Sequence, residues 1–180
     1  YGAYPVAEKY IAVLENTFYY KDWAKAQRKF LYNDEAVETD PLLGNMRRNL
    51  LAENHLIQMD GFDTELIRLA EQNPSNKTAF RYAGVFYLLA KDMTRFKTLV
   101  ETYYGTDLLP SLPVSFQEAV IILSEKDPDY WKRFGVSESI VGRFTDYKRQ
   151  VLAGRNNSNA LPGLMYRSYG DTYWYYYMFK

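Results

Sequence analysis

The stretch that decides the fold runs from residue 75 to residue 105 and reads Ser75-Asn-Lys-Thr-Ala-Phe-Arg-Tyr-Ala-Gly-Val-Phe-Tyr-Leu-Leu-Ala-Lys-Asp-Met-Thr-Arg-Phe-Lys-Thr-Leu-Val-Glu-Thr-Tyr-Tyr-Gly105. Large apolar residues recur in both halves of this stretch with the spacing of a helix. Lys91-Asp92 separates the halves, and Gly105 is a typical helix stop. The stretch therefore predicts two helices joined by a tight turn, which must lie antiparallel.

Two similar hairpins are predicted before this one. In the first, Asp22 is the expected N-cap of the return helix, and the outgoing helix is expected to bury one apolar face, formed by Val6, Tyr10, Val13, Leu14, Thr17 and Phe18. In the second, Asp40-Pro41 opens a helix that continues to Ile57. Asp60-Gly61 breaks that helix, and its return helix ends near Asn73-Pro74, because the residue before proline resists helical geometry.

The C-terminal part continues the helical pattern. Asp127-Pro128 caps a short helix, and Ser137 opens a longer one that ends at Gly154. No stretch alternates with the period of a strand, so the chain is predicted to be all-α. We expect a helical repeat domain over residues 1–153, with residues 154–180 as an aromatic C-terminal capping segment of the same domain.

The return helices repeat at a regular interval. Ala26, Phe62 and Phe96 fall in register at intervals of 36 and 34 residues, which is typical of helical solenoids. The chain resembles the tetratricopeptide repeat family in its third hairpin, where four residues fall on the family's large, large, small and aromatic positions: Phe80, Ala83, Gly84 and Tyr87. Phe62 and Phe96 depart from the family, which has a small residue there. The resemblance implies a right-handed superhelix of about four helical hairpins.

A second resemblance lies in the ending Tyr169-Gly-Asp-Thr-Tyr-Trp-Tyr-Tyr-Tyr177, taken with the block from Phe80 to Tyr87. Together they resemble the C-terminal ectodomain of a family of uncharacterised bacterial membrane-anchored proteins. The resemblance implies a soluble module on the periplasmic or extracytoplasmic side, with a membrane anchor upstream. Within the chain itself, no apolar run approaches the roughly 18 residues of a membrane span.

Composition argues against several classes of function. The 22 basic and 22 acidic residues cancel, so the chain lacks the positive charge that dominates nucleic-acid binding. His55 is the only histidine and there is no cysteine, which disfavours a zinc site or a catalytic triad. The close carboxylate pairs lie at predicted helix ends, where capping explains them: Asp34/Glu35, Asp60/Asp63 and Asp127/Asp129. We expect no enzyme activity, no cofactor and no metal.

The aromatic residues, 18 Tyr, 10 Phe and 3 Trp, are the one compositional excess. They fill interfaces between helices, or some of them line a binding surface. The expected groove residues are Tyr10, Arg47, Asn54, Arg81 and Tyr82. A terminal aromatic patch is formed by Tyr173, Trp174, Tyr176 and Tyr177, and it either covers the last hairpin or faces a partner or membrane. The predicted function is a non-catalytic scaffold for a protein or peptide; the alternative is a carbohydrate-binding module with aromatic platforms.

Overall fold

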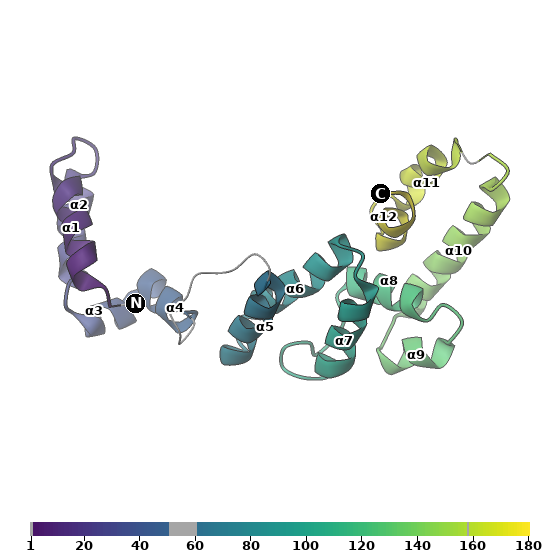
Figure 1. Cartoon of the computed structure of the whole chain (residues 1–180), viewed down its shortest axis with the longest axis horizontal. Coiled ribbons are helices and arrows are strands. Elements are labelled where there is room, and N and C mark those ends of the chain that lie inside the picture. Colours follow the sequence, from purple (N-terminus) through teal and green to yellow (C-terminus); the bar gives the residue numbers. More distant parts are fainter. Residues whose placement is uncertain (1, 51–60, 158) are drawn as a thin grey trace. The chain divides into compact units, whose positions relative to one another are not determined.

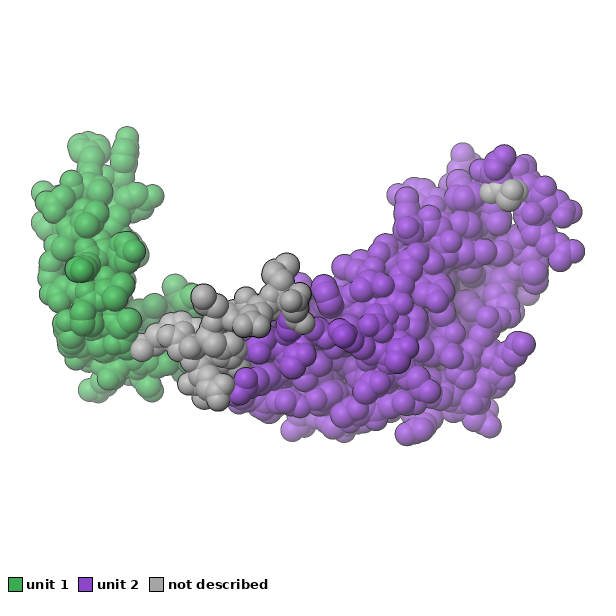
Figure 2. All heavy atoms as spheres, viewed as in Figure 1, with its two compact units in different colours: residues 1–60 green, residues 61–180 purple. Residues whose placement is uncertain are grey.

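The computed structural model describes residues 2–50, 61–157 and 159–180. Within these ranges every regular element is a helix and there is no strand (Figure 1), so the predicted all-α class is confirmed. The chain divides into two compact units, residues 1–60 and residues 61–180 (Figure 2). Each unit is described by itself below.

Unit 1 begins with two antiparallel helices that pack side by side. Its elements are α1 (Tyr4–Glu15), α2 (Lys21–Gln27), the 3-10 helix η1 (Arg28–Phe30), α3 (Asp34–Thr39) and α4 (Pro41–Arg48). The predicted cap of α4 is confirmed: the Asp40 carboxylate accepts hydrogen bonds from the N–H groups of Leu42 at 3.0 Å and Leu43 at 2.9 Å, with Pro41 at the first helical position.

The prediction of which face of α1 is buried is wrong. Val6, Tyr10 and Val13 are exposed, whereas Ile11 is buried. Two polar contacts set this orientation, because the Glu15 carboxylate pairs with Arg28 at 2.6 Å and the Glu8 carboxylate accepts from the Tyr32 hydroxyl at 3.1 Å. Positions 8, 11 and 15 share one helix face, so these bonds turn Ile11 inward and Tyr10 outward.

Further differences concern helix ends in unit 1. Asp22 does not cap α2; it lies in the first turn of a helix that begins at Lys21. The helix opened by Pro41 ends at Arg48, and Ile57 lies outside the described residues. Helix α3 was not predicted, although it has a recognisable cap, since the Asn33 side chain accepts from the N–H of Ala36 at 3.1 Å.

Ala26, the small residue expected at the closest approach of two helices, is exposed. Ala24 is fully buried instead. The expectation that Ala26 is the closely packed small residue of this helix is therefore wrong, and Ala24 takes that place.

Unit 2 contains eight helices within its described residues: α5 (Phe62–Gln72), α6 (Lys77–Leu89), α7 (Met93–Tyr103), α8 (Val114–Leu123), α9 (Pro128–Arg133), α10 (Glu138–Gly154), α11 (Leu161–Tyr169) and α12 (Tyr173–Phe179). The predicted cap of α9 is confirmed, since Asp127 accepts from Asp129 N–H at 3.1 Å. In the predicted turn Lys91-Asp92, the Asp92 side chain caps α7 by accepting from Arg95 N–H at 3.0 Å. The predicted end of α10 at Gly154 is also confirmed.

The core of unit 2 is aromatic and closely packed. Phe80, Phe96 and Phe116 are fully buried, and the rings of Phe96 and Phe116 meet edge to face with centroids 5.1 Å apart. Gly84 makes room for this arrangement, because a Cβ at that position would lie 2.1 Å from the Phe116 ring. The glycine therefore sets the distance between α6 and α8.

The C-terminal segment is built into the core of unit 2. Helix α12 packs against α8, where Glu118 binds it twice: the Glu118 carboxylate accepts from the N–H of Tyr173 at 2.7 Å, and the Glu118 main-chain carbonyl accepts from the Trp174 indole at 2.8 Å. The Tyr173 hydroxyl also donates to the Leu88 carbonyl at 3.0 Å. These buried bonds join residues more than 50 positions apart in the sequence.

We predict that Gly84→Ala destabilises the chain by about 1–3 kcal/mol, because the added methyl group overpacks the core against Phe116. The matched control is Gly142→Ala in α10, where an added Cβ meets nothing within 4 Å; it is expected to stabilise by about 0.5–1 kcal/mol. Urea denaturation measures both changes, and equal effects of the two substitutions would contradict the packing argument.

A second prediction concerns Glu118, which is 2% exposed. Burial raises the pKa of its carboxyl above the ordinary 4.5, although the bond from Tyr173 N–H lowers it in part. The folded state thus favours the protonated form, so this contribution to stability is complete below the unfolded pKa and is lost as pH rises through the folded pKa.

Glu118→Gln keeps an acceptor for Tyr173 and removes the titration. Its unfolding free energy is therefore expected to gain on that of the unchanged chain as pH increases from acidic to neutral. Urea titrations at several pH values test this, and parallel pH profiles of the two proteins would show that Glu118 is not the titrating group.

Candidate functional site

An apolar cavity lies inside unit 1 and has a volume of about 500 Å³. Side chains from α1, α2, η1, α3 and α4 bound it, and most of them are aliphatic or aromatic. The lining residues are Gly2, Ala3, Tyr4, Ala7, Ile11, Trp23, Gln27, Phe30, Leu31, Val37, Leu43, Met46, Arg47 and Leu50. Such a cavity with few polar groups at its edge is the usual form of a binding site.

The cavity is open because unit 1 has little closed core. Among its described apolar side chains, only Ile11 and Ala24 are buried. Met46, which lines the cavity, and Leu42, one turn earlier on α4, are both exposed. By itself, unit 1 leaves large apolar side chains in contact with water, which is typical of surfaces that take part in binding.

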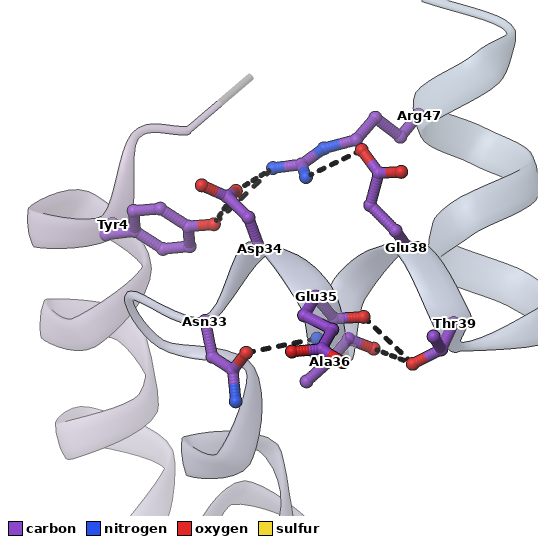
Figure 3. Close-up of polar contacts among 8 residues, drawn as sticks. All are labelled: Tyr4, Asn33, Asp34, Glu35, Ala36, Glu38, Thr39 and Arg47. Atoms are coloured by element: carbon purple, nitrogen blue, oxygen red, sulfur yellow. Dashed lines mark hydrogen bonds and ion pairs between the residues drawn. The ribbon is translucent and has the colours of Figure 1, made fainter.

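A cluster of hydrogen-bonded side chains lies at the rim of this cavity (Figure 3). Tyr4 reaches from α1, and Arg47 reaches from α4 between two carboxylates of α3. The Tyr4 hydroxyl donates to Asp34 at 2.5 Å, and Arg47 donates to the same carboxylate oxygen at 2.6 Å. Arg47 also contacts the Glu38 carboxylate at 3.5 Å. Three elements of unit 1 are tied together at this edge of the cavity.

These contacts fix the charges of the cluster. The hydrogen bond from Tyr4 and then the bond from Arg47 lower the pKa of the Asp34 carboxyl, so Asp34 is ionised at neutral pH. The bond to Asp34 in turn raises the pKa of Arg47. At the rim, two carboxylates, Asp34 and Glu38, share the one guanidinium of Arg47, so this cluster has a net negative charge.

Unit 2 has a smaller apolar cavity of about 360 Å³ between α8, α10 and α12. Its lining is formed by Ile122, Glu125, Phe144, Tyr147, Lys148, Val151, Leu152, Trp174, Tyr177 and Met178. Glu125 and Lys148 form an ion pair with each other. Their charges are therefore compensated within the site, and the remaining lining offers mainly apolar contact.

The predicted groove residues are distributed over both units. Arg47 lines the cavity of unit 1, whereas Tyr10 is exposed on α1 outside the set of lining residues. Asn54, like His55, lies outside the described residues. Arg81 and Tyr82 are exposed on α6 of unit 2 and do not line that unit's cavity.

The predicted terminal patch is divided between core and surface. Tyr173 and Trp174 are buried. Tyr176 is half-buried, and its hydroxyl donates to the Leu89 carbonyl at 2.7 Å. Tyr177 is exposed and lines the cavity of unit 2. Of the four residues, Tyr177 alone is both exposed and part of a cavity.

Asp63 is a buried polar residue that the sequence suggested only as a helix cap. Its carboxylate accepts from the Tyr87 hydroxyl at 2.8 Å and from Arg95 at 3.2 Å. Burial and this bond raise the pKa of Tyr87 to about 12, so the tyrosine remains a neutral donor. The contact joins α5, α6 and α7, and no sequence motif marks it, because its members lie 24 and 32 residues apart from Asp63.

The described residues thus form an all-helical protein with apolar cavities and without a cluster of three or more His, Cys, Asp or Glu side chains that could hold a metal ion. A family model described as a family of unknown function, DUF6057, matches residues 1–180, and the chain belongs to this family. No significant match was found among curated proteins or among solved structures. In the ranges that the structure describes, no helix is long and apolar enough to cross a membrane.

Proposed function

We propose that the chain is a non-catalytic scaffold that binds a protein or peptide segment at the cavity of unit 1. The observation that carries this proposal is the combination of an apolar cavity of about 500 Å³ with a unit in which only two described apolar side chains are buried. A partner that inserts an apolar anchor residue there covers side chains that the unit leaves exposed. Such anchors supply most of the energy of protein interfaces.

The rim determines which segments suit the cavity best. Asp34 and Glu38 are exposed carboxylates, and their side chains are 71% and 64% accessible. Arg47 forms ion pairs with both carboxylates. A bound segment with a lysine or arginine close to its apolar anchor therefore meets opposite charge. Such complementary charges increase the rate of association and fix the register of the segment more than they increase its affinity.

The proposal extends to architecture and location. In a tetratricopeptide-like superhelix, stacked hairpins present an inner surface for binding, and Arg81 and Tyr82 are exposed on α6 of unit 2. The similarity of the third hairpin to that repeat supports this arrangement. The resemblance of the C-terminal motif to ectodomains of membrane-anchored proteins supports a position on the extracytoplasmic side of a bacterial membrane, behind an upstream anchor.

A carbohydrate is the second candidate ligand, and Trp23 is the observation in its favour. The Trp23 indole lines the cavity of unit 1 and remains 55% exposed. An exposed aromatic face suits the apolar face of a sugar ring as well as an apolar side chain. The two candidates differ in one measurable respect, since the carbohydrate reading alone predicts heat of binding from soluble oligosaccharides.

To test the proposal, a large side chain is introduced at the edge of the cavity. Ala7 is exposed on α1 and lines the cavity, whereas Ala26 is exposed on α2 and does not. Ala7→Trp is expected to reduce recovery of the partner in affinity capture from membranes at least tenfold, because the indole occupies the space of the anchor (about 1.4 kcal/mol of lost binding). Ala26→Trp, the matched control, is expected to retain the partner.

A photo-crosslinking residue identifies contact directly. Placed at Met46, which lines the cavity, it should yield an adduct with the captured protein; placed at Leu42, which is equally exposed on α4 but outside the lining, it should not. Equal capture by both tryptophan variants, or adducts at both positions, would contradict binding in the cavity. Heat from oligosaccharides that Ala7→Trp abolishes would favour the carbohydrate reading.

A further inference from the structure

The turn between α1 and α2 presents an unusual concentration of aromatic side chains. Phe18 is 92% exposed, Tyr19 87%, Tyr20 57% and Trp23 55%. The turn lies at the end of the α1–α2 hairpin (Figure 1). We call these four residues the aromatic tip. Single exposed aromatic residues are ordinary, but four within six positions are a contiguous apolar surface that requires an explanation.

The tip is held in shape by polar bonds rather than by burial. The Thr17 hydroxyl donates to the Leu14 carbonyl at 2.7 Å and accepts from the Tyr20 N–H at 3.2 Å. The Asn16 side chain donates to the Ala12 carbonyl at 2.8 Å. Phe18 and Tyr19 contact each other edge to face, with centroids 5.2 Å apart. Because the turn is already ordered, little conformational entropy remains to be lost when it binds.

The charges beside the tip are mainly positive. Two exposed lysines of α2 lie next to the tip residues: Lys21 between Tyr20 and Trp23, and Lys25 after Trp23. Asp22 is the one acidic residue between the two lysines. In the part of the chain that the structure describes, neither lysine forms an ion pair. Glu15, the nearest carboxylate on α1, is held by Arg28. The bond from Arg28 and, to a smaller extent, the charge of Lys25 lower the pKa of the Glu15 carboxyl. Positive charge nevertheless exceeds negative charge beside the tip, and Lys21 is exposed to a negatively charged surface.

We propose that the aromatic tip binds the surface of a lipid bilayer. Tyrosine and tryptophan are the side chains that prefer the boundary between hydrocarbon and water, because their rings are apolar and their polar ends remain hydrated. Phe18, the most exposed of the four, enters the acyl region, while Lys21 and Lys25 meet lipid phosphates. The occupant is thus a phospholipid surface, which accommodates a projecting tip without a matching groove.

This site is separate from the rim of the cavity. Tyr4 and Glu15 lie at opposite ends of α1, about 16 Å apart at 1.5 Å per residue, and the tip follows Glu15. Trp23 belongs to the tip and also lines the cavity, so the decisive substitutions are made at Phe18 and Tyr19, which do not. Loss of lipid binding at the tip can therefore be distinguished from loss of partner binding in the cavity.

The test is flotation of the 180-residue chain with phosphatidylcholine vesicles, with and without phosphatidylglycerol. The unchanged chain is expected to float with both and several-fold more with the anionic vesicles. Phe18→Ser/Tyr19→Ser is expected to lower the bound fraction at least tenfold. The matched control, Leu89→Ser/Leu164→Ser, removes two exposed apolar side chains from unit 2, each 58% exposed, and is expected to bind as the unchanged chain does.

Tryptophan fluorescence supplies an independent readout. Trp174 is buried and Trp131 is half-buried, so bilayer contact should blue-shift and quench Trp23, with brominated lipid as the quencher. Trp23→Phe should abolish this change while flotation persists. The proposal would be overturned if the unchanged chain floated with neither vesicle type. It would also be overturned if Phe18→Ser/Tyr19→Ser and the control floated equally while circular dichroism showed that both remain folded.

Discussion

Glu118 is the residue on which the arrangement of unit 2 depends, because it holds α12 through both its carboxylate and its main-chain carbonyl. A carboxylate that is 2% exposed is costly unless it is hydrogen-bonded, and here the N–H of Tyr173 supplies the bond. The two hydrophobic clusters of the unit meet around the same helix, since Phe116 belongs to one and Ile121 to the other. The C-terminal helix α12 is therefore part of the packed core of unit 2.

Unit 1 is organised in a different way. Its helices are oriented by bonds between charged and hydroxyl groups, such as Glu15 with Arg28 and Asp34 with Tyr4 and Arg47. Exposed contacts of this type contribute little stability each, but they fix direction. The apolar side chains that they leave unburied are the material of both the cavity and the aromatic tip. Among the described residues of unit 1, the open cavity and the exposed tip are thus two results of the same small number of buried apolar side chains.

The sequence predicted the helices well where local chemistry decides them. Asp40 and Asp127 were recognisable as caps and Lys91-Asp92 as a turn, because caps and tight turns depend on one residue and its neighbours. Gly84 was recognised only through its match to the small position of the tetratricopeptide repeat. The inward face of α1 could not be predicted, since Val6, Tyr10 and Ile11 all have large side chains that can pack in a core. The bond from Glu15 to Arg28, 13 residues away, decides between the two faces.

The same limit applied to the candidate sites. Arg47 was predicted as a groove residue, but its carboxylate partners lie on α3, a helix whose six residues are too few for a periodic pattern. The aromatic tail was expected either to cover the last hairpin or to face a partner or membrane. Trp174 is buried, and its indole donates to the main-chain carbonyl of Glu118. A hydrogen bond between residues 56 positions apart leaves no trace in spacing or composition.

The unequal burial of the two units has a consequence for turnover. A ligand that binds only the folded form stabilises it in proportion to the logarithm of its concentration, and in this chain the benefit falls on unit 1, which has least closed core of its own. If a ligand fills the cavity as proposed, the stability of unit 1 should rise with the concentration of that ligand. Without the proposed ligand, unit 1 would open more often and expose cleavable backbone, so the lifetime of the protein would depend on the supply of that ligand.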